Sequence, residues 1–248
     1  MGAPCTRWTS DRSPSEVTAE LAIDRGAARE RTNLGDGSSW VDVVAAFVPG
    51  AATMFDDVRA STQWQQTEVL RYDRYVPERR LSGFIAPGNA AAAVRQTGMH
   101  LDSVYRQRFD GVAAILYRDG TDFQGLHSDR EMRWLNETLI GILVLGERRP
   151  FVLRRRGPSA QFVDRTPAGQ AEGDVVLLPG HGDLLVMGGR CQIDWLHGIP
   201  ASPTTLPRIS LTWRWTSRRG RPDTNPGYYD GRQFSDRPRQ GGTRQRPG

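Results

Sequence analysis

The sequence predicts a mostly β protein with flanking helices (α+β), in which the strands form a double-stranded β-helix, or jelly roll. The C-terminal half of the chain holds six to eight short segments rich in β-branched and aromatic residues. Glycine, proline and aspartate separate these segments at nearly regular intervals. This pattern is typical of an antiparallel double sheet or barrel, whereas alternating strand and helix patterns would indicate a parallel sheet.

The chain is long enough for one sizeable core with tails. It has 248 residues, of which 38% are hydrophobic. Residues 1–38 are polar with little apolar periodicity, and we interpret them as a disordered leader. The domain is therefore expected over residues 39–217, beginning near "WVDVVAAFVPG". Two distant cysteines, Cys5 and Cys191, and the lack of a signal-peptide pattern favour a reducing cytoplasm.

The N-terminal half of the domain predicts helices around an aromatic and basic segment. "AATMFDDVRASTQW" carries apolar residues at roughly helical spacing and predicts an amphipathic helix on the outside of a sheet. "EVLRYDRYVPERRLSGFIAPG" alternates aromatic residues with arginines and breaks at two prolines, so we expect a strand followed by an exposed loop. "NAAAAVRQTGMHLDSVYRQRF" predicts a second helix.

The strands are expected from Phe109 onward. "FDGVAAILYRDG" predicts a strand that closes on an Arg-Asp-Gly turn. The further predicted strands are "TLIGILVLG", "PFVLRRR", "DVVLLPG", "DLLVMGG", "QIDWLHGIP" and "RISLTWRWTS".

A histidine and an aspartate lie two positions apart in "GLHSDRE". On an extended chain His127 and Asp129 project from the same face, so both can reach one ion. Such a pair arises easily by chance, but His197 in "WLHGIP" offers a third ligand. Two histidines and one carboxylate occupy one face of iron(II) and leave positions open for a bidentate cosubstrate and dioxygen. Arg208 and Arg214 share one face of the last strand and are suited to bind a carboxylate.

Five motifs in register resemble the AlkB family of iron(II)/2-oxoglutarate dioxygenases. They are "YRDG", "HSDRE", "HGDLLVMGG", "WLHGIP" and "RISLTWR", within a catalytic core of about residues 109–216. The resemblance implies iron(II) as cofactor, with 2-oxoglutarate and dioxygen as cosubstrates. It implies that His127, Asp129 and His197 bind the iron.

The resemblance also assigns residues to the cosubstrate. It implies that Arg208 grips the distal carboxylate of 2-oxoglutarate, that Arg214 approaches the carboxylate beside the keto group, and that Tyr117 helps to hold the molecule. Two positions that are usually asparagine in the family are Ile115 and Ser210 here, and Ser210 remains a candidate for cosubstrate binding.

Substrate recognition is expected in a nucleotide lid over about residues 69–88. The aromatic and arginine mixture there could stack a base and contact phosphates. Exposed loops often carry such residues without that purpose. Glu131 also departs from the family, in which the position is typically aspartate. The substrate candidates are Tyr72, Tyr75, Arg79, Phe84 and Glu131.

Three functions follow from these expectations. The first is the oxidative removal of N-alkyl groups from damaged bases of DNA or RNA, with release of formaldehyde, succinate and carbon dioxide. The second is the same chemistry on a small metabolite or a protein side chain, suggested by Ile115, Ser210 and the zero net charge of residues 1–217. The third is a non-catalytic nucleic-acid-binding protein in which the jelly roll is only a scaffold.

The net charge of +5 is concentrated at the C-terminus. Residues 218–248 contain eight arginines and three aspartates, a surplus equal to the net charge of the whole chain. We interpret this segment as a basic disordered tail that follows a phosphate backbone, although a merely solubilising tail explains it equally well. We expect a monomer that binds nucleic acid and no membrane, since no apolar run is long and continuous enough to span a bilayer.

Two other groups of residues could have either a structural or a functional role. His181 in "GHGDLL" lacks the spacing of a ligand, and we expect a turn role. Arg154, Arg155 and Arg156 could form either a solvated strand end or a phosphate contact.

Overall fold

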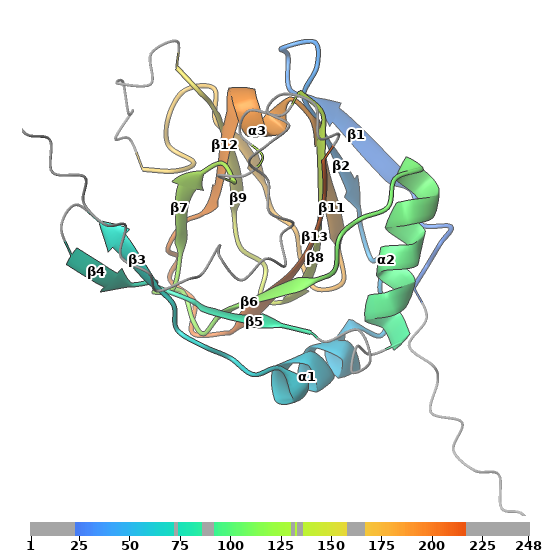
Figure 1. Cartoon of the computed structure of the whole chain (residues 1–248), viewed down its shortest axis with the longest axis vertical. Coiled ribbons are helices and arrows are strands. Elements are labelled where there is room, and N and C mark those ends of the chain that lie inside the picture. The colour runs from blue at the N-terminus through green and yellow to red at the C-terminus, as the bar shows by residue number, and fades with distance from the viewer. Residues whose placement is uncertain are drawn as a thin grey trace, which may run out of the picture.

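Two antiparallel sheets lie face to face and confirm the predicted double sheet (Figure 1). The computed structural model describes residues 23–71, 74–85, 92–129, 132, 136–157 and 167–216. Seven strands form the larger sheet, in the order β1 (Arg29–Asn33), β2 (Trp40–Val44), β11 (Leu184–Gly189), β8 (Thr138–Gly146), β13 (Arg208–Thr216), β6 (Ala113–Tyr117) and β5 (Leu81–Phe84). Four strands form the smaller sheet, in the order β10 (Val175–Leu177), β9 (Phe151–Arg155), β12 (Trp195–Ile199) and β7 (Gln124–His127).

The larger sheet separates two hydrophobic cores. Strand β8 shows the division, because its residues alternate between the two faces of the sheet. Leu143 and Leu145 belong to the core beneath the helices. Ile142 and Val144 belong to the core between the sheets. Both faces of β8 are therefore buried, which explains why its sequence is a continuous apolar run.

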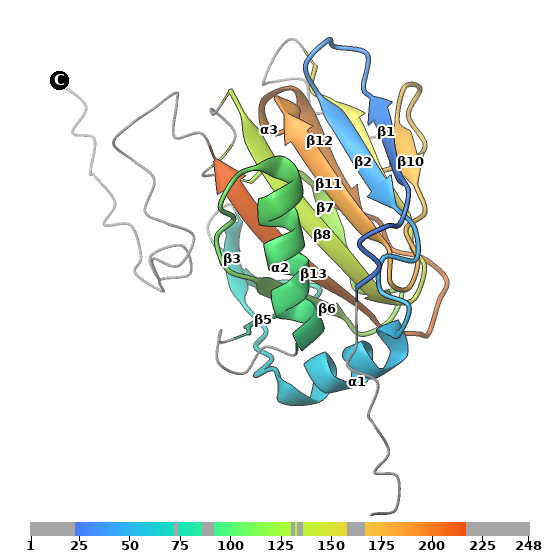
Figure 2. The same cartoon turned by 90° about the vertical axis from the view of Figure 1, so that its right-hand side faces the viewer.

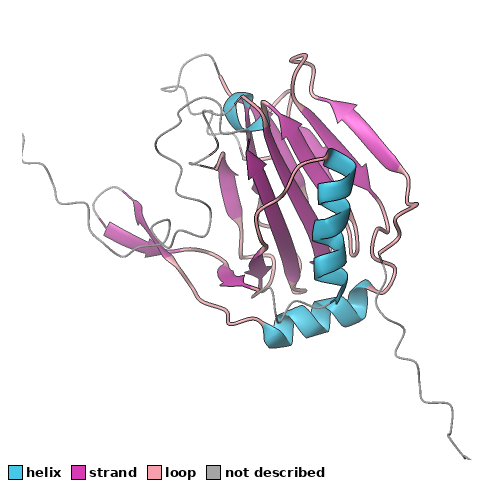
Figure 3. Ribbon diagram, turned by 45° about the vertical axis from the view of Figure 1, so that its right-hand side comes forward, coloured by secondary structure: helices cyan, strands magenta, loops and turns pink. Residues whose placement is uncertain are grey.

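The two predicted helices are confirmed and cover the outer face of the larger sheet (Figure 3). Helix α1 (Ala51–Ser61) buries Met54 and Val58, and helix α2 (Ala92–Tyr105) buries Leu101. A Cβ atom on Gly141 of β8 would lie only 2.8 Å from a methyl group of Leu101. The glycine thus allows α2 to pack closely on the sheet.

The boundary predicted for the leader is wrong, because the ordered structure begins before residue 39. Strand β1 pairs with β2 at the edge of the larger sheet (Figure 2), although all five of its residues are exposed. Strand β1 has no buried apolar face, and an ion pair holds it to the sheet instead. Arg31 donates two hydrogen bonds to the buried Asp42 of β2, at 2.6 and 2.8 Å, and the Tyr105 hydroxyl donates a third at 2.8 Å.

The segment predicted as one strand and a loop contains three strands instead. Strands β3 (Glu68–Arg71) and β4 (Arg74–Pro77) form a hairpin, and β5 joins the larger sheet beside β6. Pro77 does not break the hairpin because it occupies the last position of β4, where few ladder bonds are needed. In addition, "QIDWLHGIP" begins with a helical turn, α3 (Cys191–Asp194), before β12.

Both predicted tails lie largely outside the described residues. Residues 1–22 and 217–248 are not described, so the disordered start of the leader and the basic tail stay predictions. Within the described part of the chain, no helix is long and apolar enough to cross a membrane. Cys191 is buried and forms no disulfide with a described residue.

We expect Asp42→Ala to lower the free energy of unfolding by about 2 kcal/mol, because it removes the acceptor of three hydrogen bonds that join β1, β2 and α2. Chemical denaturation followed by circular dichroism would measure this. Asp56→Ala, at an exposed position of α1, serves as the control and should leave the unfolding midpoint unchanged. Equal midpoints for the two variants would contradict the role assigned to Asp42.

Candidate active site

Three candidate metal ligands meet at the smaller sheet. His127 ends β7, and His197 lies directly opposite on the neighbouring strand β12. Their ring centroids are 4.3 Å apart. Asp129 follows β7 by two residues, and one ligand atom from each of the three residues lies within 4.8 Å of the others. The sequence prediction that these side chains converge is therefore confirmed.

A β-bulge aims His127 at this point. Between the paired positions, β12 has one residue, whereas β7 has two. The extra residue on β7 changes the direction of the following side chains. Gly198 of β12 permits the close pairing here, since a Cβ atom on it would lie 2.8 Å from the carbonyl oxygen of Gln124.

Hydrogen bonds fix the orientation of two of the ligands. The Nδ1–H of His127 donates to the carbonyl oxygen of Gly125 at 3.0 Å. The lone pair on Nε2 is therefore available to a metal. The Nε–H of Arg214 donates to Oδ2 of Asp129 at 2.7 Å. The other oxygen, Oδ1, lies 3.6 Å from Nε2 of His127.

The protonation states of His197 and Asp129 are suited to binding a metal ion. Burial, together with the neighbouring His127, lowers the pKa of His197 to about 3, so its imidazole is neutral. Burial raises the pKa of Asp129, but Arg214 and His127 outweigh this effect and hold it well below its usual range. Neutral imidazole and ionised carboxylate are the forms that bind a metal ion.

The buried guanidinium group of Arg208 forms a second part of the candidate site. Arg208 is fully buried, and its Nε and Nη2 have no hydrogen-bond acceptor among the described residues. Its Nη1 donates only long bonds, of 3.4 Å, to the carbonyl oxygens of Arg149 and Pro179. Burial lowers the pKa of Arg208 to about 10, so it remains charged at neutral pH. A bound carboxylate would supply the missing acceptors, which fits the end of 2-oxoglutarate.

The other predicted cosubstrate residues lie on the same inward face. Tyr117 pairs with Arg208 across β6 and β13, and both are buried. Ser210 is also buried, and its hydroxyl has no partner among the described residues. Arg214 lies four residues after Ser210 and so shares its face of the strand.

The sequence analysis missed Arg149, a second fully buried arginine beside this pocket. Its guanidinium donates to the carbonyl oxygens of Asp119 and Asp122, at 3.1 and 2.7 Å, and to that of Pro200 at 2.7 Å. It lies 5.3 Å from the centre of the Tyr117 ring. Arg149 therefore ties the turn after β6 to the chain after β12. Nothing in "GERRPF" distinguishes it from the neighbouring arginines, since its burial depends on the tertiary fold.

Three of the predicted substrate residues are exposed in the segment predicted to form the lid. Tyr75 and Phe84 are each 48% exposed, and Arg79 is exposed as well. Tyr72 and Glu131 lie outside the described residues. The neighbouring Arg80 turns inward instead: it donates to Oε1 of Gln124 on β7 and pairs with Glu78 at 2.9 Å.

The structure gives different answers for the other residues whose roles were left open by the sequence. His181 accepts a hydrogen bond from the backbone N–H of Gly146 at 2.6 Å, which confirms its turn role. Both interpretations of Arg154 are wrong, because it is buried in a two-bond pair with Asp174, with both distances 2.7 Å. Arg155 and Arg156 remain exposed.

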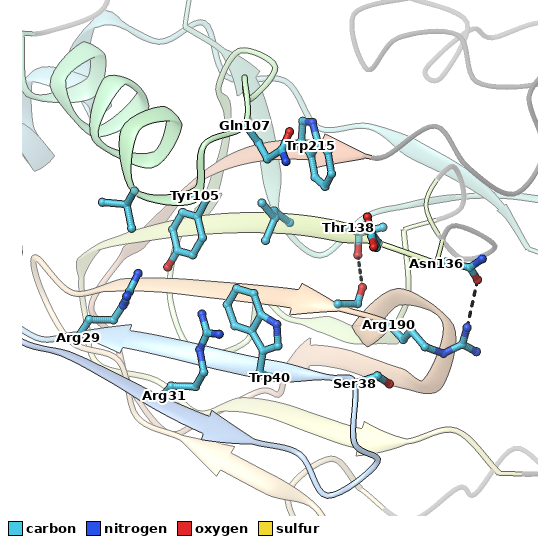
Figure 4. Close-up of a pocket in the computed structure, with 14 residues that line it drawn as sticks. Arg29, Arg31, Ser38, Trp40, Tyr105, Gln107, Asn136, Thr138, Arg190 and Trp215 are labelled. Carbon is cyan, nitrogen blue, oxygen red and sulfur yellow. Dashed lines mark hydrogen bonds between the residues drawn. The ribbon is translucent and has the colours of Figure 1, made fainter.

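A separate hollow on the outer face of the larger sheet has a volume of about 620 Å³ (Figure 4). Arginines and aromatic rings line it, and the arginines already have carboxylate partners, with Arg29 and Arg31 sharing Asp42. Arg31 stacks 3.7 Å above the Trp40 ring and pairs with Asp42, and Arg190 pairs with Asp194 at 2.8 Å. None of the three candidate metal ligands lines this hollow.

Comparison with known proteins agrees with the site geometry. Residues 89–214, half of the chain, match the 2OG-Fe(II) oxygenase superfamily. The chain belongs to this superfamily. Its cofactor is accordingly iron(II), with 2-oxoglutarate and dioxygen as cosubstrates, and the protein is a dioxygenase.

Relatives of this oxygenase confirm the predicted membership of the AlkB family. The chain is 26% identical to the DNA oxidative demethylase ALKBH2 of Arabidopsis thaliana, over 84% of this chain and 77% of the relative. It is 26% identical to the alpha-ketoglutarate-dependent dioxygenase alkB homolog 3 of Mus musculus, over 77% of this chain and 71% of the relative. Human ALKBH2 is 33% identical over 46% of this chain and 42% of its own.

A solved structure supports the fold of this oxygenase. The prolyl hydroxylase of Trichoplax adhaerens, solved with a peptide of hypoxia inducible factor, superposes with a TM-score of 0.51. It covers 72% of this chain and 84% of its own at 11% identity. The predicted jelly roll is thereby confirmed.

We expect Arg208→Met to weaken 2-oxoglutarate binding by about 100-fold, because a desolvated guanidinium–carboxylate pair is lost. Without cosubstrate, the unfolding midpoint should not fall, since the variant removes a buried charge whose Nε and Nη2 donors lack acceptors among the described residues. Calorimetric titration of the Mn(II)-loaded oxygenase measures the affinity. Arg148→Met, at an exposed arginine, is the control. Unchanged affinity in Arg208→Met would contradict the assigned pocket.

Proposed function

We propose that this dioxygenase removes N-alkyl groups oxidatively from bases of nucleic acid, with iron bound by His127, Asp129 and His197. The observation that carries the proposal is the convergence of these three candidate ligands, in a fold that also holds a buried arginine, Arg208, whose Nε and Nη2 have no acceptor among the described residues. A two-histidine, one-carboxylate set suits iron(II) and leaves positions open for a bidentate cosubstrate and dioxygen.

The chain itself provides binding and orientation. Arg208 binds the distal carboxylate of 2-oxoglutarate, and Tyr117 and Ser210 line the same inward face. Arg214 keeps the Asp129 carboxylate ionised and oriented. When bound, iron and its cosubstrates supply the oxidation: 2-oxoglutarate becomes succinate and carbon dioxide, and the oxidised alkyl carbon leaves as formaldehyde.

Two observations support a nucleic-acid base as the target. The relatives reported above include proteins named DNA oxidative demethylase. The lid also presents exposed aromatic and basic side chains, Tyr75, Arg79 and Phe84, close in sequence to Arg80, which contacts β7. Stacking and phosphate contacts of this kind hold an extruded base. The monomeric state and the cytoplasmic location stay predictions.

The deciding experiment presents oligonucleotides that carry 1-methyladenine or 3-methylcytosine, with iron(II), ascorbate and 2-oxoglutarate. We expect formaldehyde and a restored base, detected by mass spectrometry. Turnover of 2-oxoglutarate without repair of any methylated base would exclude the nucleic-acid target and favour a small metabolite or a protein side chain.

We expect His127→Ala to abolish measurable succinate production, because the metal site loses one of its three ligands. His181→Ala is the matched control: this exposed histidine accepts a backbone hydrogen bond in a turn and is not one of the three candidate ligands, so most activity should remain. Succinate would be quantified by mass spectrometry in the presence of methylated oligonucleotide. Full activity of His127→Ala would refute the proposed ligand set.

The basic tail yields a separate prediction. Deleting residues 218–248 should weaken oligonucleotide binding at low salt and reduce the salt dependence of binding, because eight arginines are lost. The rate of 2-oxoglutarate turnover without substrate should not change, since the predicted site residues all lie within residues 72–214. Fluorescence anisotropy at several salt concentrations would measure the affinity. Identical salt slopes for the two chains would mean that the tail is only solubilising.

A further inference from the structure

Gln192 is a buried glutamine that contacts the backbone of the candidate ligand Asp129. It lies in α3, the helical turn immediately before β12, and is only 1% exposed. Its Oε1 accepts a hydrogen bond from the backbone N–H of Asp129 at 2.8 Å. A backbone N–H can only donate, so the orientation of the Gln192 amide is determined by this bond.

Asp129 needs such a contact because the sheet does not hold it. Strand β7 ends at His127, so the ladder that fixes the two histidines opposite each other does not extend to Asp129. Arg214 holds one carboxylate oxygen, whereas Gln192 holds the main chain from which the carboxylate projects.

The turn that carries Gln192 is itself braced. Arg190 and Asp194 form an ion pair across it at 2.8 Å, and the Cys191 side chain is buried beneath it. Arg156 of the chain after β9 donates its backbone N–H to Asp194 at 2.7 Å and its Nε–H to Ile193 at 2.9 Å.

The same arginine also reaches the ligand segment. Nη2 of Arg156 donates to Oγ of Ser128 at 2.6 Å, and Ser128 lies between two of the candidate ligands. Two side chains, Gln192 and Arg156, therefore join the segment 128–129 to one rigid turn. Because that turn leads directly into β12, it also precedes His197 by only a few residues.

We propose that Gln192 is a positioning residue that sets the distance of the Asp129 carboxylate from the two histidines and thereby the metal affinity. The proposal rests on the proposed iron site. Outer contacts that orient metal ligands typically change metal affinity by about 10–100-fold when they are lost.

Stability does not explain the residue. Nε2 of Gln192 is buried and has no acceptor among the described residues. A buried amide donor without an acceptor destabilises a fold, so an apolar side chain of the same length would be the better choice for packing alone. The hydrogen bond to Asp129 is the contact for which the amide is needed.

The test compares three variants of the full chain by titration with Mn(II), with free metal measured by electron paramagnetic resonance. Gln192→Met removes the acceptor and keeps the length, and we expect about 10-fold weaker binding. Gln192→Glu keeps an acceptor oxygen and should bind at least as tightly as the unaltered chain. Gln170→Met, at an exposed glutamine, is the matched control and should leave the affinity unchanged.

Thermal unfolding of the metal-free variants separates affinity from folding. If Gln192→Met does not fold, Gln192→Asn, which is too short to reach Asp129, takes its place against Gln192→Glu. Equal affinities of Gln192→Met and the unaltered chain would overturn the role of Gln192 alone. Equal weakening in Gln192→Met and Gln192→Glu would also overturn it, because packing and not the hydrogen bond would then matter.

Asp129→Ala distinguishes this failure from failure of the iron site. If the unaltered chain binds Mn(II) and Asp129→Ala does not weaken that binding, the ligand set is wrong and the Gln192 proposal falls with it. Weak binding in both Asp129→Ala and Gln192→Met, with Gln192→Glu restored, is the result that supports the proposal.

Discussion

The antiparallel pairing of β7 with β12 is the constraint on which the candidate active site depends. It places His127 opposite His197, although the two residues are far apart in the sequence, and it brings their rings to 4.3 Å. The register is strongly specified, because a slip of one residue would turn every side chain of the strand to the other face. The bulge on β7 shifts the register between the two paired positions and changes the direction of the side chains that follow, including that of His127.

The charges of the pocket are unbalanced in a way that a dianion would correct. Arg208 and Arg149 are both fully buried, and their nearest acceptors are backbone carbonyl groups rather than carboxylates. Arg214 has a carboxylate partner, but that carboxylate is Asp129, which a bound metal would also use. Two buried guanidinium groups that have no carboxylate hydrogen-bond acceptor among the described residues are unfavourable on their own. The two carboxylates of 2-oxoglutarate offer compensation, so the site gives up stability to gain affinity for its cosubstrate.

The sequence was informative where periodicity or a motif carried the signal. The strand β8 could be predicted from its continuous apolar run and the two helices from their apolar spacing. The convergence of His127, Asp129 and His197 could be predicted from their motifs. Strand β1 could not, since its five residues are exposed and an ion pair to Asp42 replaces the apolar face. Arg149, Gln192 and the inward turn of Arg80 could not be predicted either. Their roles come from backbone atoms of distant segments, and such contacts leave no local pattern.

The two departures from the family pattern turn out to be one change in the structure. Ile115 on β6 and Ser210 on β13 are directly paired across the strands, two residues along from the pair formed by Tyr117 and Arg208. Side chains directly opposite on one face lie close enough to interact, and an isoleucine offers a serine no hydrogen bond. The Ser210 hydroxyl accordingly has no partner among the described residues. We infer that the coupled substitution alters the wall of the predicted cosubstrate pocket and leaves the candidate metal ligands in place, because those ligands are held by β7, β12, α3 and Arg214, in contacts that involve neither Ile115 nor Ser210.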